Sequence, residues 1–299
     1  MNRLQNLDRA LQLLLAETGE QAPIPDTLAD KQQLLRALMN VRQPAPPSDE
    51  LLTAQDKELQ RQRDEKGVVA FTEPGLHLWQ GDITRLQVDA IVNAANSQLL
   101  GCFVPLHACI DNAIHSAAGI QLRCACHDLM RTQGHDEPTG HARITPGFNL
   151  PARYVLHTVG PIIPDGRPTS EQVAQLASCY RVCLDLAEEH ALRSVAFCCI
   201  STGVFRFPQR QAAETAIRTV HQYPRRHVQT IANQPWFYVV RAPYAGLCPR
   251  FHLWLAWCLV CNGSRTYVPW FYVLDTDLPW QLAEKYCRYP TNRTSDSFI

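Results

Sequence analysis

Three side chains that can bind a metal ion lie close together in the chain: Cys102, His107 and Cys109. Two thiolates and one imidazole form a donor set that suits zinc. Three protein ligands leave the fourth tetrahedral position open, as in a catalytic zinc site. The chain also holds 12 Cys and 11 His, so close groups of three arise by chance, and ordinary thiols are the alternative interpretation.

The surrounding pattern predicts where these three residues lie. A strand-like apolar run at residues 88–92 precedes them, and a helical pattern over about residues 108–118 follows. Residues two apart, such as His107 and Cys109, cannot share a helix face. They would therefore bind a metal from a strand-to-helix loop and the first helical turn. In open α/β sheets, loops at the carboxyl ends of strands are where ligands bind. The same stretch carries Asn93, Asn96 and Asp111.

Several motifs in order resemble the macrodomain family of ADP-ribose binders and hydrolases. They are GDI at residues 81–83, NAANSQLLG from Asn93, IDNAIHSAAG from Ile110, and ISTGVF from Ile200. The Cys-x4-His-x-Cys pattern before IDNAIH is similar to the zinc-containing branch, whose members remove ADP-ribose from proteins. The resemblance covers roughly residues 78–220 and extends to an N-terminal helical segment. It implies one Zn²⁺ per chain, bound by Cys102, His107 and Cys109.

The resemblance also implies how ADP-ribose is bound. From its tripeptide alone, Asp82 fits a turn residue or helix cap. In macrodomains the matching aspartate accepts a hydrogen bond from the adenine amino group, and the next backbone amide, here Ile83, contacts the base. The small-residue turn at residues 201–205 can aim backbone N–H groups at a diphosphate. The family binds pyrophosphate with this loop, here Ser201, Thr202, Gly203, Val204 and Phe205.

Catalysis is expected beside the predicted zinc. Zinc can lower the pKa of bound water to about 7 or polarise a substrate oxygen. We expect Asn96 to orient the distal ribose and Asp111 to position or deprotonate water. A cap or loop-orienting role for Asp111 is the alternative. Arg206 stands where many macrodomains have a glycine. The remaining histidines are expected to serve the fold, His115 through a local helix contact and His157 in the core.

The predicted function is a zinc-dependent hydrolase that removes mono-ADP-ribose from protein side chains, with carboxylate linkage favoured by the family. Its expected partners are ADP-ribosylated proteins and ADP-ribose. Two alternatives stay open. The first is a non-catalytic ADP-ribose-binding reader, and the second is a damaged macrodomain without activity.

The alternation of strands and helices after residue 76 predicts a sheet covered by helices on both faces. The resemblance implies that this is the three-layer α/β/α macrodomain with a mixed sheet. Leucines at helical spacing predict an N-terminal helical extension over residues 1–70. The macrodomain is expected at 71–222. Residues 223–299 form an atypical segment, with five of the six tryptophans, and are expected to supply a closing strand at 236–241 or 268–274 and a helix at 278–286.

Composition limits the function classes. Lysine plus arginine and aspartate plus glutamate are 28 each, which argues against a general nucleic-acid or membrane-surface binder. No signal peptide or stretch of about 18 apolar residues is visible. Cysteines without a secretory signal are expected to be reduced thiols. The sequence therefore predicts a cytoplasmic protein.

Overall fold

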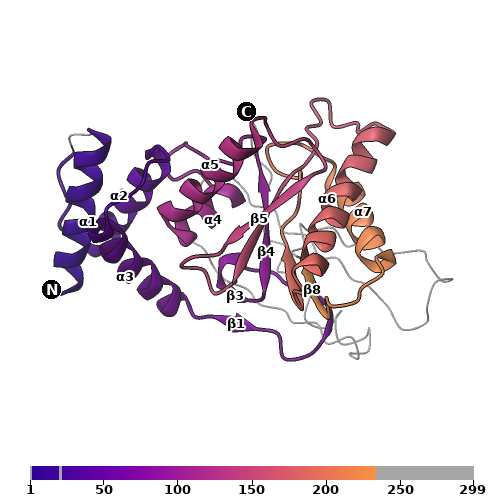
Figure 1. Cartoon of the computed structure of the whole chain (residues 1–299), viewed down its shortest axis with the longest axis horizontal. Helices are drawn as coiled ribbons and strands as arrows, with labels where there is room; N and C mark the ends of the chain where they lie inside the picture. The colour runs from indigo at the N-terminus through magenta and orange to yellow at the C-terminus, as the bar shows by residue number, and fades with distance from the viewer. Residues whose placement is uncertain (1, 20–21, 234–299) are drawn as a thin grey trace, which may run out of the picture.

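The computed structural model describes residues 2–19 and 22–233. Three helices come first: α1 (Arg3–Thr18), α2 (Leu28–Val41) and α3 (Asp49–Lys66). Each begins at a polar cap, Asn2, Thr27 or Ser48, whose side chain accepts a hydrogen bond from a backbone N–H of the first turn. Their leucines form a hydrophobic core that is separate from the core around the sheet. These helices are the predicted extension, and they lie at one end of the molecule (Figure 1).

A six-stranded mixed sheet forms the centre of the rest of the described chain. Its strand order is β2-β8-β7-β4-β6-β5. Neighbouring strands are parallel except β5, which runs antiparallel to β6 at the edge. The strands are β2 (Gly75–Leu78), β4 (Ala90–Ala95), β5 (Ala142–Pro146), β6 (Tyr154–Val159), β7 (Ser194–Phe197) and β8 (Thr230–Asn233). A separate parallel pair joins β1 (Val69–Ala70) to β3 (Leu86–Gln87), which follows the short 3₁₀ turn η1 (Ile83–Arg85).

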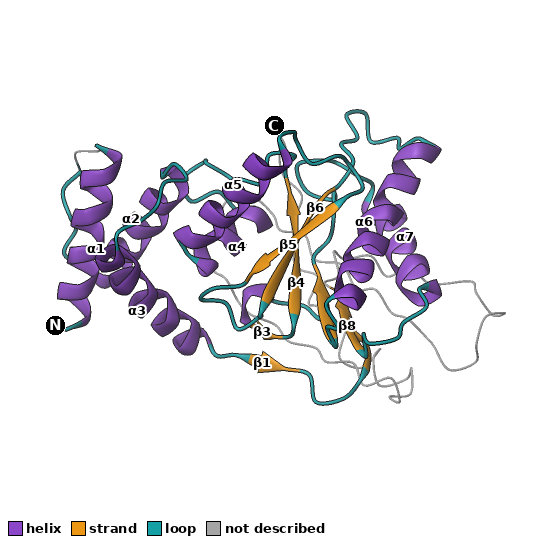
Figure 2. Ribbon diagram, in the orientation of Figure 1, coloured by secondary structure: helices purple, strands orange, loops and turns teal. Residues whose placement is uncertain are grey.

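Helices cover both faces of this sheet. On one side, α4 (Ile110–Ala118) and α5 (Ile120–Gln133) lie between the sheet and the N-terminal helices. On the other side lie α6 (Ser170–Glu189) and α7 (Gln209–Gln222), as Figure 2 shows. Side chains of both helical layers and of the central strands form one core. The predicted three-layer α/β/α architecture with a mixed sheet and an N-terminal helical extension is confirmed. No helix in the described ranges is long and apolar enough to cross a membrane.

Strand β8 lies earlier in the chain than either strand expected after residue 222. It occupies Thr230–Asn233 and is hydrogen-bonded between β2 and β7. Both predicted ranges, 236–241 and 268–274, and the predicted helix at 278–286 lie outside the described residues. Only Ile231 and Ala232 of β8 are buried hydrophobic residues, so the strand carries almost no apolar pattern.

The N-terminal helices contact the rest of the fold at the junction of α4 and α5. The side chain of Gln55 in α3 is fully buried, and its Oε1 accepts a 2.9 Å hydrogen bond from the backbone N–H of Ile120. Gly119, between the two helices, has φ of 100°, and a Cβ there would lie 2.8 Å from Nε2 of Gln55. A side chain at this position would therefore separate α3 from the α4–α5 turn.

Candidate active site

The three predicted metal ligands meet in space. The ligand atoms of Cys102, His107 and Cys109 all lie within 4.8 Å of one another, and each residue is partly exposed. Sγ of Cys102 lies 3.5 Å from Nδ1 of His107. Tetrahedral zinc with ordinary Zn–S and Zn–N bonds would hold a sulfur and a nitrogen about 3.6 Å apart. The donor set and its spacing therefore fit zinc.

Cys109 occupies the N-cap position of α4. Its Sγ accepts a hydrogen bond from the backbone N–H of Asn112 at 3.4 Å, so the thiol sits where the helix dipole favours negative charge. Burial nevertheless raises the pKa of the Cys109 thiol to about 11; the Asn112 N–H opposes this rise and the neighbouring Cys102 adds to it. A metal cation between the two thiols would favour their thiolate forms instead, because coordinated thiols are deprotonated.

The loop from β4 to α4 has an unusual backbone. Leu99, Gly101 and Leu106 have φ of 58°, 77° and 57°, in the left-handed region. A Cβ at Gly101 would lie 2.9 Å from the His115 ring, so only glycine fits there. The two leucines adopt a conformation that costs roughly 1–2 kcal/mol for a residue with a side chain. This folded loop brings Cys102 and His107 together before the chain enters α4.

Asp111 lies in the first turn of α4 and is 6% exposed. Nδ2 of Asn93 in β4 donates a 2.8 Å hydrogen bond to its Oδ1. Nε2 of His115 lies 3.5 Å from the same oxygen. Burial raises the pKa of Asp111 to about 6, against the effect of the Asn93 hydrogen bond. Oδ2 receives no hydrogen bond from a described residue, so it is the oxygen that a water or substrate could use.

Asn96, the other predicted catalytic residue, is held by the loop itself. Its Nδ2 donates to the carbonyl of Gly101 at 3.1 Å, and its Oδ1 accepts from the backbone N–H of Gln98 at 3.1 Å. The carboxamide in contact with Asp111 is that of Asn93. The sequence analysis named Asn93 without giving it a role, and nothing in its spacing distinguishes it from Asn96.

A second group of possible ligand atoms lies in the core: His115, Cys126 and His157. Nδ1 of His157 is 3.2 Å from Nδ2 of Asn93, and Nε2 is 2.9 Å from Oγ1 of Thr145. Burial lowers the pKa of His157 to about 3. Both ring nitrogens thus have hydrogen-bonding partners. We interpret His157 as a satisfied histidine of the core, as the sequence predicted, whereas the two ring nitrogens of His115 have no hydrogen-bonding partner among the described residues.

The predicted adenine residues lie just after β2. Asp82 caps η1: its Oδ1 accepts from the backbone N–H of Thr84 at 2.9 Å and from Oγ1 of Thr84 at 2.6 Å. Nζ of Lys66 is 3.5 Å from Oδ2. The side chain of Asp82 is 39% exposed, whereas Ile83 is buried. Asp82 therefore has the capping role that its tripeptide suggests, and its second oxygen remains accessible.

The predicted diphosphate loop connects β7 to α7. Ser201 and Arg206 have φ of 65° and 58°, and the N–H of Phe207 donates to the carbonyl of Ser201 at 2.9 Å. Gly203 and Val204 are exposed. Within the described residues, the backbone N–H groups of residues 203–205 donate to no protein carbonyl. These groups are free to bind an anion.

The end of β6 lies against this loop. A Cβ at Gly160 would lie 2.0 Å from Oγ of Ser201, and the N–H of Ile163 donates to the carbonyl of Phe205 at 2.8 Å. Oγ of Ser201 is buried without a hydrogen-bonding partner among the described residues. The close approach requires glycine at position 160.

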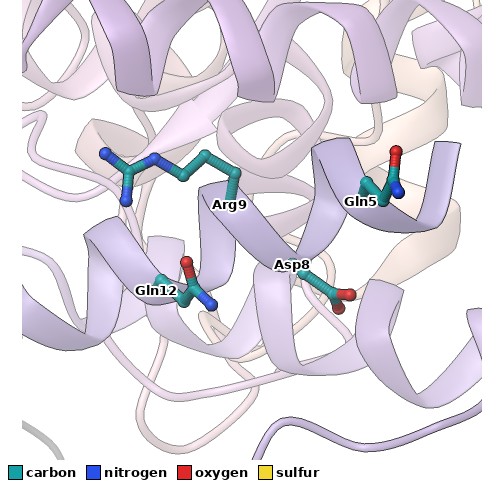
Figure 3. Close-up of a pocket in the computed structure, with 4 residues that line it drawn as sticks. All are labelled: Gln5, Asp8, Arg9 and Gln12. Atoms are coloured by element: carbon teal, nitrogen blue, oxygen red, sulfur yellow. The ribbon is translucent and has the colours of Figure 1, made fainter. Parts of the chain in front are cut away.

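A hollow on the N-terminal extension contains none of the predicted site residues. It is lined by Gln5, Asp8, Arg9 and Gln12, all on α1 (Figure 3). Arg9 pairs with Glu50 of α3 at 2.6 Å, and Asp8 pairs with Lys31 of α2. These charged side chains therefore join the helices of the extension to one another.

Known proteins resemble this chain over the same region. The Macro domain model matches residues 92–216. A protein-ADP-ribose hydrolase of Treponema medium is 52% identical over 209 residues, which are 67% of this chain and 80% of that protein. One of Staphylococcus aureus (strain MSSA476) is 50% identical over 205 residues, 67% of this chain and 77% of that protein. A solved macrodomain of Trypanosoma brucei, in complex with ADP-ribose, is 30% identical with a TM-score of 0.49, covering 66% of this chain and 88% of that one. Because the two hydrolases are about 50% identical to it and are covered over more than two thirds of their length, the chain belongs to the Macro domain family.

Proposed function

We propose that this enzyme, like its relatives named protein-ADP-ribose hydrolase, removes mono-ADP-ribose from protein side chains, and that it does so with one bound Zn²⁺. The ligands would be Cys102, His107 and Cys109. The observation that carries the proposal is the convergence of their ligand atoms within 4.8 Å, on the loop that follows β4. The relatives at about 50% identity carry the name of this activity.

The two ends of ADP-ribose would bind to separate loops. Asp82 would accept the adenine amino group at its accessible Oδ2, with the backbone of Ile83 beside the base. The free N–H groups of Gly203, Val204 and Phe205 would bind the diphosphate. The distal ribose would then face the loop between β4 and α4.

At the distal ribose, the chain's own residues would orient the sugar and manage a proton. Asn96 supports the loop that lies against the ribose through its bond to Gly101. Asp111 is fixed at Oδ1 by Asn93, which leaves Oδ2 to accept a proton from water or to hold that water in position. When bound, zinc would supply a Lewis acid and an ionisable water. We propose carboxylate-linked ADP-ribose as the substrate.

The experiment is single-turnover release of ADP-ribose from a mono-ADP-ribosylated protein. The purified enzyme is compared as isolated, after zinc chelation, and as Cys102→Ala. Release by the intact enzyme alone supports the proposal. Equal release by all three limits zinc to a structural role. Micromolar binding of ADP-ribose without release selects the reader alternative, and no binding by a folded protein selects a damaged macrodomain.

Linkage and compartment are tested separately. Substrates modified on glutamate, serine or arginine are compared under the same conditions, and the proposal expects fastest release from glutamate. We further propose a cytoplasmic enzyme, because the reducing cytosol keeps cysteine ligands in the thiol form that a metal needs. Localising the tagged protein by cell fractionation checks this.

A further inference from the structure

The segment that holds the metal ligands, residues 102–109 and here called the metal loop, is in contact with helix α2 of the N-terminal extension. We propose that Arg36 and Asn40 of α2 are positioning residues that hold the metal loop in its ligand-binding shape. The extension then sets the affinity of the metal site. The inference rests on the proposed function in one respect, namely that the metal loop binds a metal.

Asn40 holds the loop next to one ligand. Its side chain is buried, with 1% of the residue exposed, and its Oδ1 accepts a 3.0 Å hydrogen bond from the backbone N–H of Leu106. Leu106 has the left-handed φ of 57° and directly precedes His107. Such a conformation persists only where neighbouring groups fix it. Nδ2 of Asn40 donates to Oγ of Ser116 at 3.0 Å, which fixes the orientation of the amide.

Arg36, one helical turn earlier, reaches the other parts of the loop. Its Nη2 donates to the carbonyl of His107 at 3.1 Å. Its Nε and Nη2 also donate to Oδ1 of Asn112, at 3.2 and 2.7 Å. Asn112 in turn donates from Nδ2 to the carbonyl of Val104 and from its backbone N–H to Sγ of Cys109. Arg36 therefore acts directly on one ligand residue and, through Asn112, on a second.

A third tie joins the end of α2 to the start of the metal loop. Nη1 of Arg123 in α5 donates to the carbonyls of residues 39, 40 and 42, at the C-terminus of α2. The same guanidinium donates from Nε to the carbonyl of Leu100 at 2.7 Å and lies 3.5 Å from that of Cys102. All three ligand residues are thus connected to α2 by hydrogen bonds. Because these charge-assisted hydrogen bonds join α2 to the metal loop, the helix restrains the loop before any metal binds.

The energetic consequence concerns metal affinity. A loop that already has its bound conformation loses less conformational freedom when the metal binds. Replacing residues that orient metal ligands typically lowers metal affinity about 10–100-fold. We therefore expect losses in that range for Arg36→Gln and Asn40→Ala, and a smaller loss for Arg36→Lys, which keeps the charge but not the planar fork.

The test uses the full chain and Zn²⁺ alone. Affinity is measured by competition with a chromophoric chelator for the wild type, Arg36→Gln, Arg36→Lys and Asn40→Ala. Arg3→Gln is the matched control, since Arg3 pairs with Glu58 and Glu65 inside the extension. It removes a comparable arginine network without touching the loop. Thermal unfolding confirms that each variant is folded. If Asn40→Ala does not fold, the Arg36 variants still test the proposal, because Arg36 is only partly buried.

A second readout needs no metal. Hydrogen exchange of the Leu106 amide in the metal-free protein should be about tenfold or more faster in Asn40→Ala than in the wild type and Arg3→Gln, because the amide loses its acceptor. Wild-type affinity in folded Arg36→Gln and Asn40→Ala would overturn the inference. If the wild type itself binds no zinc, the zinc part of the proposed function fails. Unchanged exchange at Leu106 then overturns the positioning role separately.

Discussion

The side-chain amide of Asn93 donates a 2.8 Å hydrogen bond to Oδ1 of Asp111, which joins the middle of β4 to the first turn of α4. The same amide nitrogen lies 3.2 Å from Nδ1 of His157. One carboxamide therefore connects the predicted catalytic carboxylate to the histidine network of the core. The carboxylate is held at one oxygen, and the other remains for chemistry.

Asp111→Asn tests this division of roles. The substitution keeps the shape of the side chain but removes its ability to accept a proton. We expect single-turnover release of ADP-ribose to fall roughly 10²–10⁴-fold, the usual contribution of a general acid or base. Zinc content should stay at the wild-type value, because Asp111 is not one of the three ligands. A release rate within a factor of two of the wild type would assign Asp111 to the capping role instead.

Cys102→Ser tests the ligand set. Removing one of the two thiolates from the three-ligand set should reduce bound zinc from about one per chain to well below half after gel filtration, measured by elemental analysis. Cys124→Ser is the matched control: Cys124 is a partly buried cysteine of α5 whose Sγ donates to the carbonyl of Ala45. It should keep its zinc. Equal zinc in the two variants would place the metal elsewhere.

Gly160→Ala tests the contact beneath the diphosphate loop. The new methyl group would lie 2.0 Å from Oγ of Ser201, so the loop must move or the protein must lose about 1–3 kcal/mol of stability from overpacking. ADP-ribose affinity, measured by calorimetry, should fall with it. Adding Ser201→Gly removes the clashing oxygen and also suits the φ of 65° at that position. The double variant should recover part of the loss, and no recovery would contradict the contact.

Acid should destabilise the fold through His157. Burial depresses the pKa of this histidine to about 3 in the native state, so the unfolded chain, with an ordinary pKa near 6.5, binds more protons below pH 6.5. The contribution of His157 to the free energy of unfolding should therefore drop as the pH falls from 6.5 towards 3, by up to about 1.4 kcal/mol for each pH unit. Urea titrations at pH 7 and 5 measure this drop.

The matched variant for that titration is His157→Gln, which can still donate to Thr145. It should show a smaller loss between pH 7 and 5. The remaining loss includes the contribution of the buried His115, whose pKa burial also lowers. Cys126 lies next to His157, and the charge of Arg123 acts on His115. Asp111, next to His115, acts in the opposite direction below pH 6, because its native pKa is raised to about 6. An unchanged loss in His157→Gln would show that other groups cause the acid sensitivity.

Much of this architecture follows from local sequence patterns. The helical pattern over about residues 108–118 predicts α4 (Ile110–Ala118), and the apolar run at 88–92 predicts β4 (Ala90–Ala95) with its start two residues early. Residues two apart cannot share a helix face, so the sequence predicts that His107 and Cys109 bind from the loop and the first helical turn. The structure places Cys109 at the N-cap of α4. Strand β8 could not be found this way, since only two of its four residues are buried and its place depends on pairing with two distant strands.

The contacts that hold the metal loop could not be predicted from the sequence either. Asn40 and Leu106 are 66 residues apart, and Arg36 and Asn112 are 76 residues apart. Each looks like an ordinary helix or loop residue in its own segment. The capping hydrogen bonds of Asp82 involve only Thr84, two residues away, so the capping role could be predicted from the sequence. Local chemistry is readable from spacing, whereas contacts between distant segments require the fold.

The position of β8 has a consequence for the order in which the protein is completed during synthesis. Strand β2, which leads into Asp82, pairs in the sheet with β8, and the N–H of Trp79 donates to the carbonyl of Asn233 at 2.9 Å. The partners of this pairing are separated by about 155 residues of chain. The segments of the metal loop and the diphosphate loop are therefore synthesised before β8, the strand that pairs with β2 beside the proposed adenine-binding residues. The nascent chain should therefore bind ADP-ribose through all the proposed loops only after Asn233 has left the ribosomal exit tunnel.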